Sequence, residues 1–318
     1  MCIIIAKQVI CPTENYIDMM DLNCSDKTRQ ACESLMQQSH LPPDFVAVIA
    51  DIYLPLSRIL IDQVGNKTLL VSINGAQGTG KSTLTHFLKL IIESELNARV
   101  ATLSLDDFYH TRRQRQLLAE QVHPLLITRG VPGTHDADLI ETVLEKFMSG
   151  KPCVVPRFNK ATDDRYDESE WSSCDRAVDV VLFEGWCNSS PVQNERQLEQ
   201  TINELEANED KQGVWRYYAN DQLKSYHQRF YQYADLCLLL KAPDFEHVYQ
   251  WRHLQEQKLK AGTPEHLQHR VLDDAALRRF LLHYERISRH TLEHLPETAD
   301  VVLPIASDHS IDSIQVKT

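Results

Sequence analysis

The residues whose types and spacing suit chemistry are concentrated in one glycine-rich stretch. Residues 75–82 read GAQGTGKS and fit the pattern G-x-x-x-x-G-K-[ST] at every fixed position. In this pattern the glycines let the backbone curve until several N–H groups point at one phosphate, and the next helix start adds positive charge. Lys81 is then expected to reach the β- and γ-phosphates, and the Ser82 hydroxyl to bind Mg²⁺. The predicted phosphate-binding residues are Gly75, Ala76, Gln77, Gly78, Thr79, Gly80, Lys81, Ser82 and Thr83.

The segments on either side of this loop have the order that a phosphate-binding loop requires. Residues 69–73 form a short apolar run typical of a buried strand. Residues 83–96 have apolar side chains at helical spacing, which is typical of a helix with one buried face. A chance glycine-rich turn is the alternative, and it would need neither segment. The sequence therefore predicts a nucleoside-triphosphate site.

Acidic residues follow two further apolar runs. Asp106 comes directly after residues 99–105, and Glu184 comes directly after residues 178–183. Because ligands of open parallel α/β sheets lie at the carboxyl ends of the strands, both acids are expected near the phosphates. Asp106 is predicted to accept the proton of an attacking hydroxyl, and Glu184 to hold Mg²⁺. The alternative for each is a capping carboxylate at the start of a helix.

Three cations lie close together in residues 157–165. Arg157, Lys160 and Arg165 alternate there with aromatic and acidic residues. Ordering several cations on a loop is costly unless they meet an anion, and arginine binds a carboxylate through two parallel hydrogen bonds. These residues are therefore predicted to hold the carboxylate of an acceptor. A surface cluster of ion pairs is the alternative.

Two basic segments fit either a binding site or an ordinary solvated surface. In residues 128–136 (TRGVPGTHD), His135 either faces a substrate or only precedes Asp136, which is placed to cap the next helix. The arginines at positions 112, 113 and 115 are expected to form a solvated helix face.

Arg252 lies on a predicted helix, residues 245–260, together with Gln255 and Glu256. The spacings i to i+3 and i to i+4 place all three side chains on one helix face. In a phosphoryl-transfer enzyme such an arginine would close over the γ-phosphate and stabilise the charge that develops there. An ordinary ion pair within the helix is the alternative.

Composition excludes several classes of protein. The formal net charge of −12 argues against a nucleic-acid or anionic-membrane surface as the main partner, because those partners need a basic surface. The eight cysteines contain no C-x-x-C pair, which makes zinc unlikely and is typical of a reduced, cytoplasmic protein. The expected partner is a small molecule, and the oligomeric state is left open.

The elements that must position these residues are strands alternating with helices. Apolar runs at residues 69–73, 99–105, 178–183, 235–241 and 299–304 predict five strands of one parallel sheet. Residues 1–64 are expected to form a helical N-terminal extension. Residues 65–318 are expected to form the nucleotide-binding domain, in which a helix at about 244–262 acts as a lid.

Taken together, these segments resemble the uridine kinase and phosphoribulokinase group of P-loop kinases. Four more specific segments resemble the D-glycerate 3-kinases of plant and fungal type. They are GVPGTHD at 130–136, PRFNK at 156–160 followed by Asp164 and Arg165, FEGW at 183–186, and WRHLQE at 251–256. Two details depart from that family's pattern: Phe158-Asn159 stands where Tyr-Asp is usual, and a glycine-rich segment after Lys160 is shortened.

The resemblance implies a P-loop α/β fold with the five strands in the order 2-3-1-4-5. It also implies ATP-dependent, Mg²⁺-assisted phosphorylation of a small hydroxy acid, with D-glycerate as the first-choice acceptor. The residues implied to act in catalysis are Lys81, Asp106, Glu184 and Arg252. Those implied to contact the acceptor are Asp106, Tyr109, His135, Arg157, Lys160 and Arg165. The alternatives are a nucleoside- or pantothenate-like acceptor, or a nucleotide-binding protein without catalysis.

Overall fold

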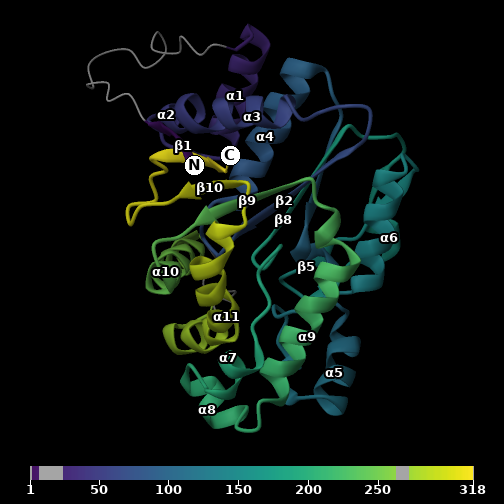
Figure 1. Cartoon of the computed structure of the whole chain (residues 1–318), viewed down its shortest axis with the longest axis vertical. Helices are drawn as coiled ribbons and strands as arrows, with labels where there is room; N and C mark the ends of the chain where they lie inside the picture. Colours follow the sequence, from purple (N-terminus) through teal and green to yellow (C-terminus); the bar gives the residue numbers. More distant parts are fainter. Residues whose placement is uncertain (1, 7–23, 263–271, 318) are drawn as a thin grey trace.

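A computed structural model describes residues 2–6, 24–262 and 272–317 of the chain, with side chains from residue 24 on except those of 258–271. Its centre is a seven-stranded sheet in the order β1-β11-β10-β9-β2-β8-β3 (Figure 1). The strands are β1 (Cys2–Ala6), β2 (Leu69–Gly75), β3 (Val100–Ser104), β8 (Val180–Gly185), β9 (Leu236–Lys241), β10 (Val301–Pro304) and β11 (Ser313–Lys317).

The strands β3, β8, β2, β9 and β10 lie in that order and are parallel to one another. The prediction of a five-stranded, all-parallel sheet is nevertheless wrong, because β11 pairs antiparallel with β10 and β1 pairs antiparallel with β11. Residues 2–6 are thus a strand, although they were expected in a helical extension. The short apolar run at 3–5 has no length for a helix, and the edge left open by β11 gives it backbone partners.

Helices cover both faces of the sheet. Their bounds are α1 (Asp26–Gln38), α2 (Phe45–Val48), α3 (Leu54–Ile61), α4 (Lys81–Leu96), α5 (Arg112–Gln121), α6 (Ala137–Met148), α7 (Glu195–Glu199), α8 (Glu204–Glu209), α9 (Val214–Arg229), α10 (Phe245–Gly262) and α11 (Asp274–His294). A π-helical turn, Ile49–Tyr53, joins α2 to α3. No helix in the described residues is long and apolar enough to cross a membrane.

The core has two layers because successive side chains of a strand point to opposite faces. Val71 and Ile73 of β2 pack with α1, α3 and α4, whereas Leu70 packs with α6 and α9. The N-terminal helices share the first layer through Cys32 and Leu56. α1 and α3 are therefore helical as expected and pack directly on α4, but whether they form a separate domain stays a prediction.

Two short antiparallel ladders hold the loop that follows α6. They pair β4 (Cys153–Val155) with β7 (Ser172–Cys174) and β5 (Phe158–Asn159) with β6 (Asp164–Arg165). These strands are too short to give a periodic signal in the sequence, and they set the positions of Lys160 and its neighbours.

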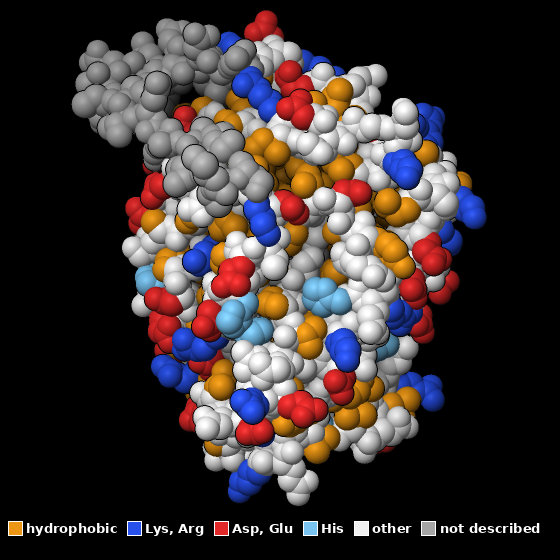
Figure 2. Space-filling model, viewed as in Figure 1, with side chains coloured by type: hydrophobic (Ala, Val, Ile, Leu, Met, Phe, Trp, Pro, Cys, Tyr) orange, Lys and Arg blue, Asp and Glu red, His pale blue; other side chains and the backbone are white. Residues whose placement is uncertain are grey.

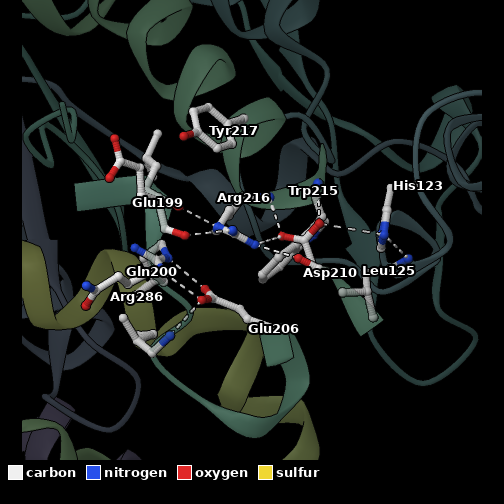
Figure 3. A network of polar contacts seen from close by, with 12 residues as sticks. His123, Leu125, Glu199, Gln200, Glu206, Asp210, Trp215, Arg216, Tyr217 and Arg286 are labelled. Atoms are coloured by element: carbon white, nitrogen blue, oxygen red, sulfur yellow. Dashed lines mark hydrogen bonds and ion pairs between the residues drawn. The ribbon is translucent and has the colours of Figure 1, made fainter. Parts of the chain in front are cut away.

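A polar network lies between α8, α9 and α11 (Figure 3). Arg216 donates to Asp210, and Arg286 donates to Glu206, and all four side chains are almost fully buried. Both arginines also donate to backbone carbonyls of residues 197–200. Asp210 and Glu206 therefore neutralise buried arginines of neighbouring helices.

The face of the molecule in Figure 2 has Lys and Arg side chains interspersed with Asp and Glu. The cysteines at 24, 32, 153, 174, 187 and 237 are free thiols.

Candidate active site

A cavity of about 720 Å³ opens at the carboxyl ends of β2, β3 and β8. Its wall includes residues of the glycine-rich loop, the turn after β3, the end of β8 and the helix α10. Acidic and basic side chains from segments more than 100 residues apart therefore meet in one place, including Lys81, Asp106, Glu184 and Arg252.

The glycine-rich loop has the backbone that phosphate binding requires. Gly78 and Gly80 adopt φ of +84° and +87°, in the left-handed region that favours glycine. Gly75 has no room for a Cβ, which would lie 2.6 Å from Thr79 Oγ1. Lys81 Nζ donates to the carbonyl of Ala76 at 3.1 Å, so the side chain folds back over the loop. Burial lowers the pKa of Lys81, against the nearby charges of Glu184 and Asp106.

Ser82 and Glu184 are brought together by the pairing of β2 with β8. The Ser82 hydroxyl donates to Glu184 Oε1 at 3.2 Å, and the Glu184 side chain is buried. Parallel register places Glu184 beside Ile73, two residues before the loop begins at Gly75. The buried carboxylate of Glu184 and the adjacent hydroxyl of Ser82 provide oxygen ligands of the kind that Mg²⁺ prefers.

Asp106 lies in the turn η2 (Leu105–Phe108) and faces the cavity with two partners. Lys160 Nζ donates to Oδ2, and the Tyr109 hydroxyl donates to Oδ1 at 2.8 Å. Burial alone would raise the pKa of Asp106, but the charge of Lys160 and the two hydrogen bonds outweigh it and lower the pKa to about 2. Asp106 is therefore an ionised carboxylate at neutral pH.

The neighbouring acid has a different position. Asp107 Oδ1 accepts a hydrogen bond from the backbone N–H of Phe158 at 3.1 Å. Burial raises the pKa of Asp107. Asp107 thus anchors the β5–β6 loop, whereas Asp106 faces the cavity with both of its oxygens bonded to side chains of the cavity wall.

The three cations that were predicted to bind the carboxylate of an acceptor lie in different environments in the structure. Lys160 lines the cavity, whereas Arg157 is exposed over the ring of Tyr166, 5.4 Å from its centroid. Arg165 donates to the carbonyl of Tyr109 at 2.8 Å and to Asp136 Oδ2 at 3.2 Å. Arg157 and Arg165 do not line the cavity, so their contact with an acceptor stays a prediction.

Tyr109 lines the cavity and His135 lies behind it. The two rings stack with centroids 4.6 Å apart, and His135 Nδ1 lies 3.2 Å from the Tyr226 hydroxyl. Burial lowers the pKa of His135 to about 3, so the ring is neutral. Asp136 caps α6 by accepting from Leu139 N at 3.1 Å, which is the capping arrangement considered from the sequence. His135 therefore supports Tyr109 and forms no part of the cavity wall.

The helix α10 contacts the glycine-rich loop and contributes Arg252 to the cavity wall. A Cβ placed on Gly78 would lie 3.0 Å from Trp251 Cβ. Trp251 stacks on His309 with ring centroids 4.0 Å apart, and His309 Nε2 lies 2.9 Å from the carbonyl of Gly78. Arg252 forms an ion pair with Glu256 within the helix, and it also lines the cavity. The helix ion pair considered from the sequence is therefore present, and it does not keep Arg252 out of the cavity wall.

Several residues of the cavity wall were not found from the sequence. They include Arg129 and Tyr284, and the Tyr284 hydroxyl donates to the carbonyl of Arg129 at 3.1 Å. Arg115, expected on a solvated face, is 1% exposed, and this expectation is corrected. Its neighbours Arg112 and Arg113 are exposed as expected. Because positions 112 and 115 are three residues apart and share a helix face, helical periodicity alone could not have shown that Arg115 is buried while Arg112 is exposed.

Comparison with known proteins gives relatives that are similar in sequence. An uncharacterized kinase of Schizosaccharomyces pombe, mug58, is 31% identical over 228 residues, which is 69% of this chain and 79% of the relative. The chloroplastic D-glycerate 3-kinase of Arabidopsis thaliana is 29% identical over 194 residues, which is 58% of this chain and 40% of that protein. The chain belongs to the glycerate 3-kinase-type family of P-loop kinases. No protein-family model matches it.

Solved structures agree with the fold of this P-loop kinase. The D-glycerate 3-kinase of Cryptococcus neoformans superposes with a TM-score of 0.67 and 24% identity, covering 89% of this chain and 99% of that one. The YGR205w protein superposes with a TM-score of 0.60 and 21% identity, covering 84% and 99%. These structures show the fold, and the kinases related in sequence show that the chain is a phosphotransferase that uses ATP and acts on a hydroxyl group.

Proposed function

We propose that this kinase phosphorylates a hydroxyl of a small organic acid, with D-glycerate as the acceptor and 3-phosphoglycerate as the product. The observation that carries the proposal is the shared cavity, in which the phosphate-binding loop lies next to Asp106 and Lys160. A carboxylate that accepts protons and a cation that binds an acid are both needed for such an acceptor, and a protein that only binds nucleotide needs neither.

The chain's own residues suit the triphosphate. The amides around Gly78 and Gly80, the start of α4 and Lys81 would hold the phosphate oxygens. Arg252 would close over the transferring group from α10, which we propose as the lid because Trp251 already contacts the loop. Such an arginine stabilises charge in the transition state and has no role in forming bonds.

The residues present also fit Mg²⁺. Ser82 and Glu184 would hold it, since their oxygens lie together at the start of α4. Bound Mg²⁺ would neutralise charge on the β- and γ-phosphate oxygens. Among the described residues no group of three or more His, Cys, Asp or Glu side chains could hold a metal by itself, which fits a cation held jointly with phosphates.

Asp106 would act on the acceptor. The acceptor hydroxyl oxygen bonds to the γ-phosphorus, the bond from that phosphorus to the bridging oxygen breaks, and ADP leaves. Asp106 takes the hydroxyl proton, with Tyr109 holding its other oxygen. The carboxylate of the acceptor would compete with Asp106 for Lys160, so binding of the acid releases the Asp106 oxygen that must accept the proton.

A panel of acceptors tests the proposal. ATP turnover would be measured with D-glycerate, pantothenate, uridine and glycerol at equal concentrations, with product position assigned by NMR. Glycerate should give the highest kcat/KM. A pantothenate or uridine optimum would replace the acceptor but keep the reaction, and pantothenate kinases are indeed among the relatives, at 27% identity over 43% of this chain. Nucleotide binding without turnover of any acceptor would contradict the proposal.

A further inference from the structure

Arg129 is a cation of the cavity wall that the sequence did not single out. It lies in the loop between η3 (Pro124–Ile127) and α6, and its guanidinium lies 5.6 Å from the centroid of the Phe158 ring. Its side chain is 23% exposed, and it forms an ion pair with Asp163. Tyr284 fixes its backbone by donating to the Arg129 carbonyl. Arg129 is thus oriented by two segments of the chain, the β5–β6 hairpin and α11.

Asp163 forms ion pairs with both Arg115 and Arg129. Arg115 Nη2 lies 3.0 Å from Asp163 Oδ2, and the Arg115 side chain is 1% exposed. Arg115 also donates to the carbonyls of Asp163 at 2.6 Å and Ile127 at 2.7 Å. Two guanidinium groups therefore share one carboxylate, and the group of three has one net positive charge. Because Arg115 is buried, the excess charge meets solvent and ligands at Arg129.

Two other cations of the wall have acids of their own, whereas Lys81 belongs to the phosphate-binding loop and donates to the carbonyl of Ala76. Lys160 pairs with Asp106, and Arg252 pairs with Glu256. Neither of these acids contacts a second arginine in the contacts that the structure describes. An incoming carboxylate can join Arg129 without removing Asp163. It can reach Lys160 only by displacing Asp106, as the proposed reaction requires, and Arg252 only by displacing Glu256.

We propose that Arg129 binds the carboxylate of the acceptor and thereby selects acids over neutral polyols, an inference that rests on the proposed function. Asp163 is a positioning residue that holds the guanidinium plane, and Arg115 is its counter-ion. An arginine presents a rigid pair of N–H groups that matches a carboxylate, so a lysine at this position would bind it less well.

The test compares acid and neutral acceptors in wild type and variants. Arg129→Gln should raise KM for D-glycerate by about 10- to 100-fold, because a charge-assisted hydrogen-bonded pair is lost. KM for ATP and turnover of glycerol should stay the same. Arg129→Lys should give an intermediate KM. The control is Arg113→Gln, which removes an exposed charge from α5 and should change none of these values.

Unchanged preference for glycerate over glycerol in a folded Arg129→Gln protein would overturn the inference and leave the proposed function intact. Should that variant fail to fold, the wild-type enzyme still decides the matter with glyceramide, in which the carboxylate is replaced by a neutral amide. Equal KM values for glycerate and glyceramide would overturn the inference. Failure of the wild-type enzyme to phosphorylate any hydroxy acid would overturn the proposed function and the inference with it.

Discussion

Lys160 Nζ forms an ion pair with Asp106 Oδ2 across the wall of the nucleotide cavity, although 54 residues separate them. The pair lowers the pKa of Asp106 and occupies one of its two oxygens. An acceptor with its own carboxylate is suited to such a site, because it can draw the lysine away from the residue that must take a proton.

Asp106→Asn should reduce kcat by about 10²- to 10⁴-fold, since an amide cannot accept the hydroxyl proton. ATP affinity, measured by equilibrium titration, should remain within about twofold because Asp106 is not part of the glycine-rich loop. The matched control is Asp107→Asn, whose side-chain oxygen can still accept from Phe158 N. Equal activity of both variants would contradict the role given to Asp106.

Lys160→Met should change the pH dependence of the reaction. In the wild type Asp106 has a pKa of about 2, so it stays ionised above about pH 3 and contributes no acid limb at ordinary pH. Without Lys160 the effect of burial, which raises this pKa, loses its main opposition. The fall of kcat/KM on the acid side, which reports protonation of Asp106, should then occur at higher pH than in the wild type. Superposable pH–rate profiles for the two proteins would argue against the coupling.

Arg252→Gln should lower kcat by about 10³-fold, with a smaller effect on KM for ATP, if the arginine stabilises charge that develops only in the transition state. Glu256→Gln keeps Arg252 but removes its ion-pair partner. It should therefore cost less activity than Arg252→Gln. Single-turnover kinetics separate the chemical step from product release, and an Arg252→Gln defect confined to ATP binding would contradict this assignment.

Glu206→Gln should lower the free energy of unfolding by about 3–5 kcal/mol, because it leaves the charge of Arg286 buried without a counter-ion. Glu209→Gln is a suitable control on the same helix. Its partner Arg279 is 52% exposed, so the change should cost less than about 1 kcal/mol. Urea denaturation of both variants measures the difference, and similar losses would show that burial of the network matters little.

Much of the phosphate site was determined by local sequence. The strand, the loop at 75–82 and the helix after it follow from apolar spacing and glycine positions, and these act over a few residues. The acids at the ends of two strands were also found, because parallel strands end at one edge of the sheet. The position of each such residue follows from the strand or loop that carries it and does not depend on a contact with a distant side chain.

The cationic side of the cavity was decided only by tertiary structure. Arg115 was expected to be solvated and is buried, while Arg129 was overlooked and lines the cavity. The antiparallel strands β1 and β11 were missed as well, and β1 finds its partner more than 300 residues along the chain. The environment of an arginine depends on which carboxylate meets it in space, and Asp163 reaches Arg115 and Arg129 from 48 and 34 residues away. Contacts between residues so far apart in the chain leave no helical or strand periodicity in the sequence, so no sequence pattern could have shown them.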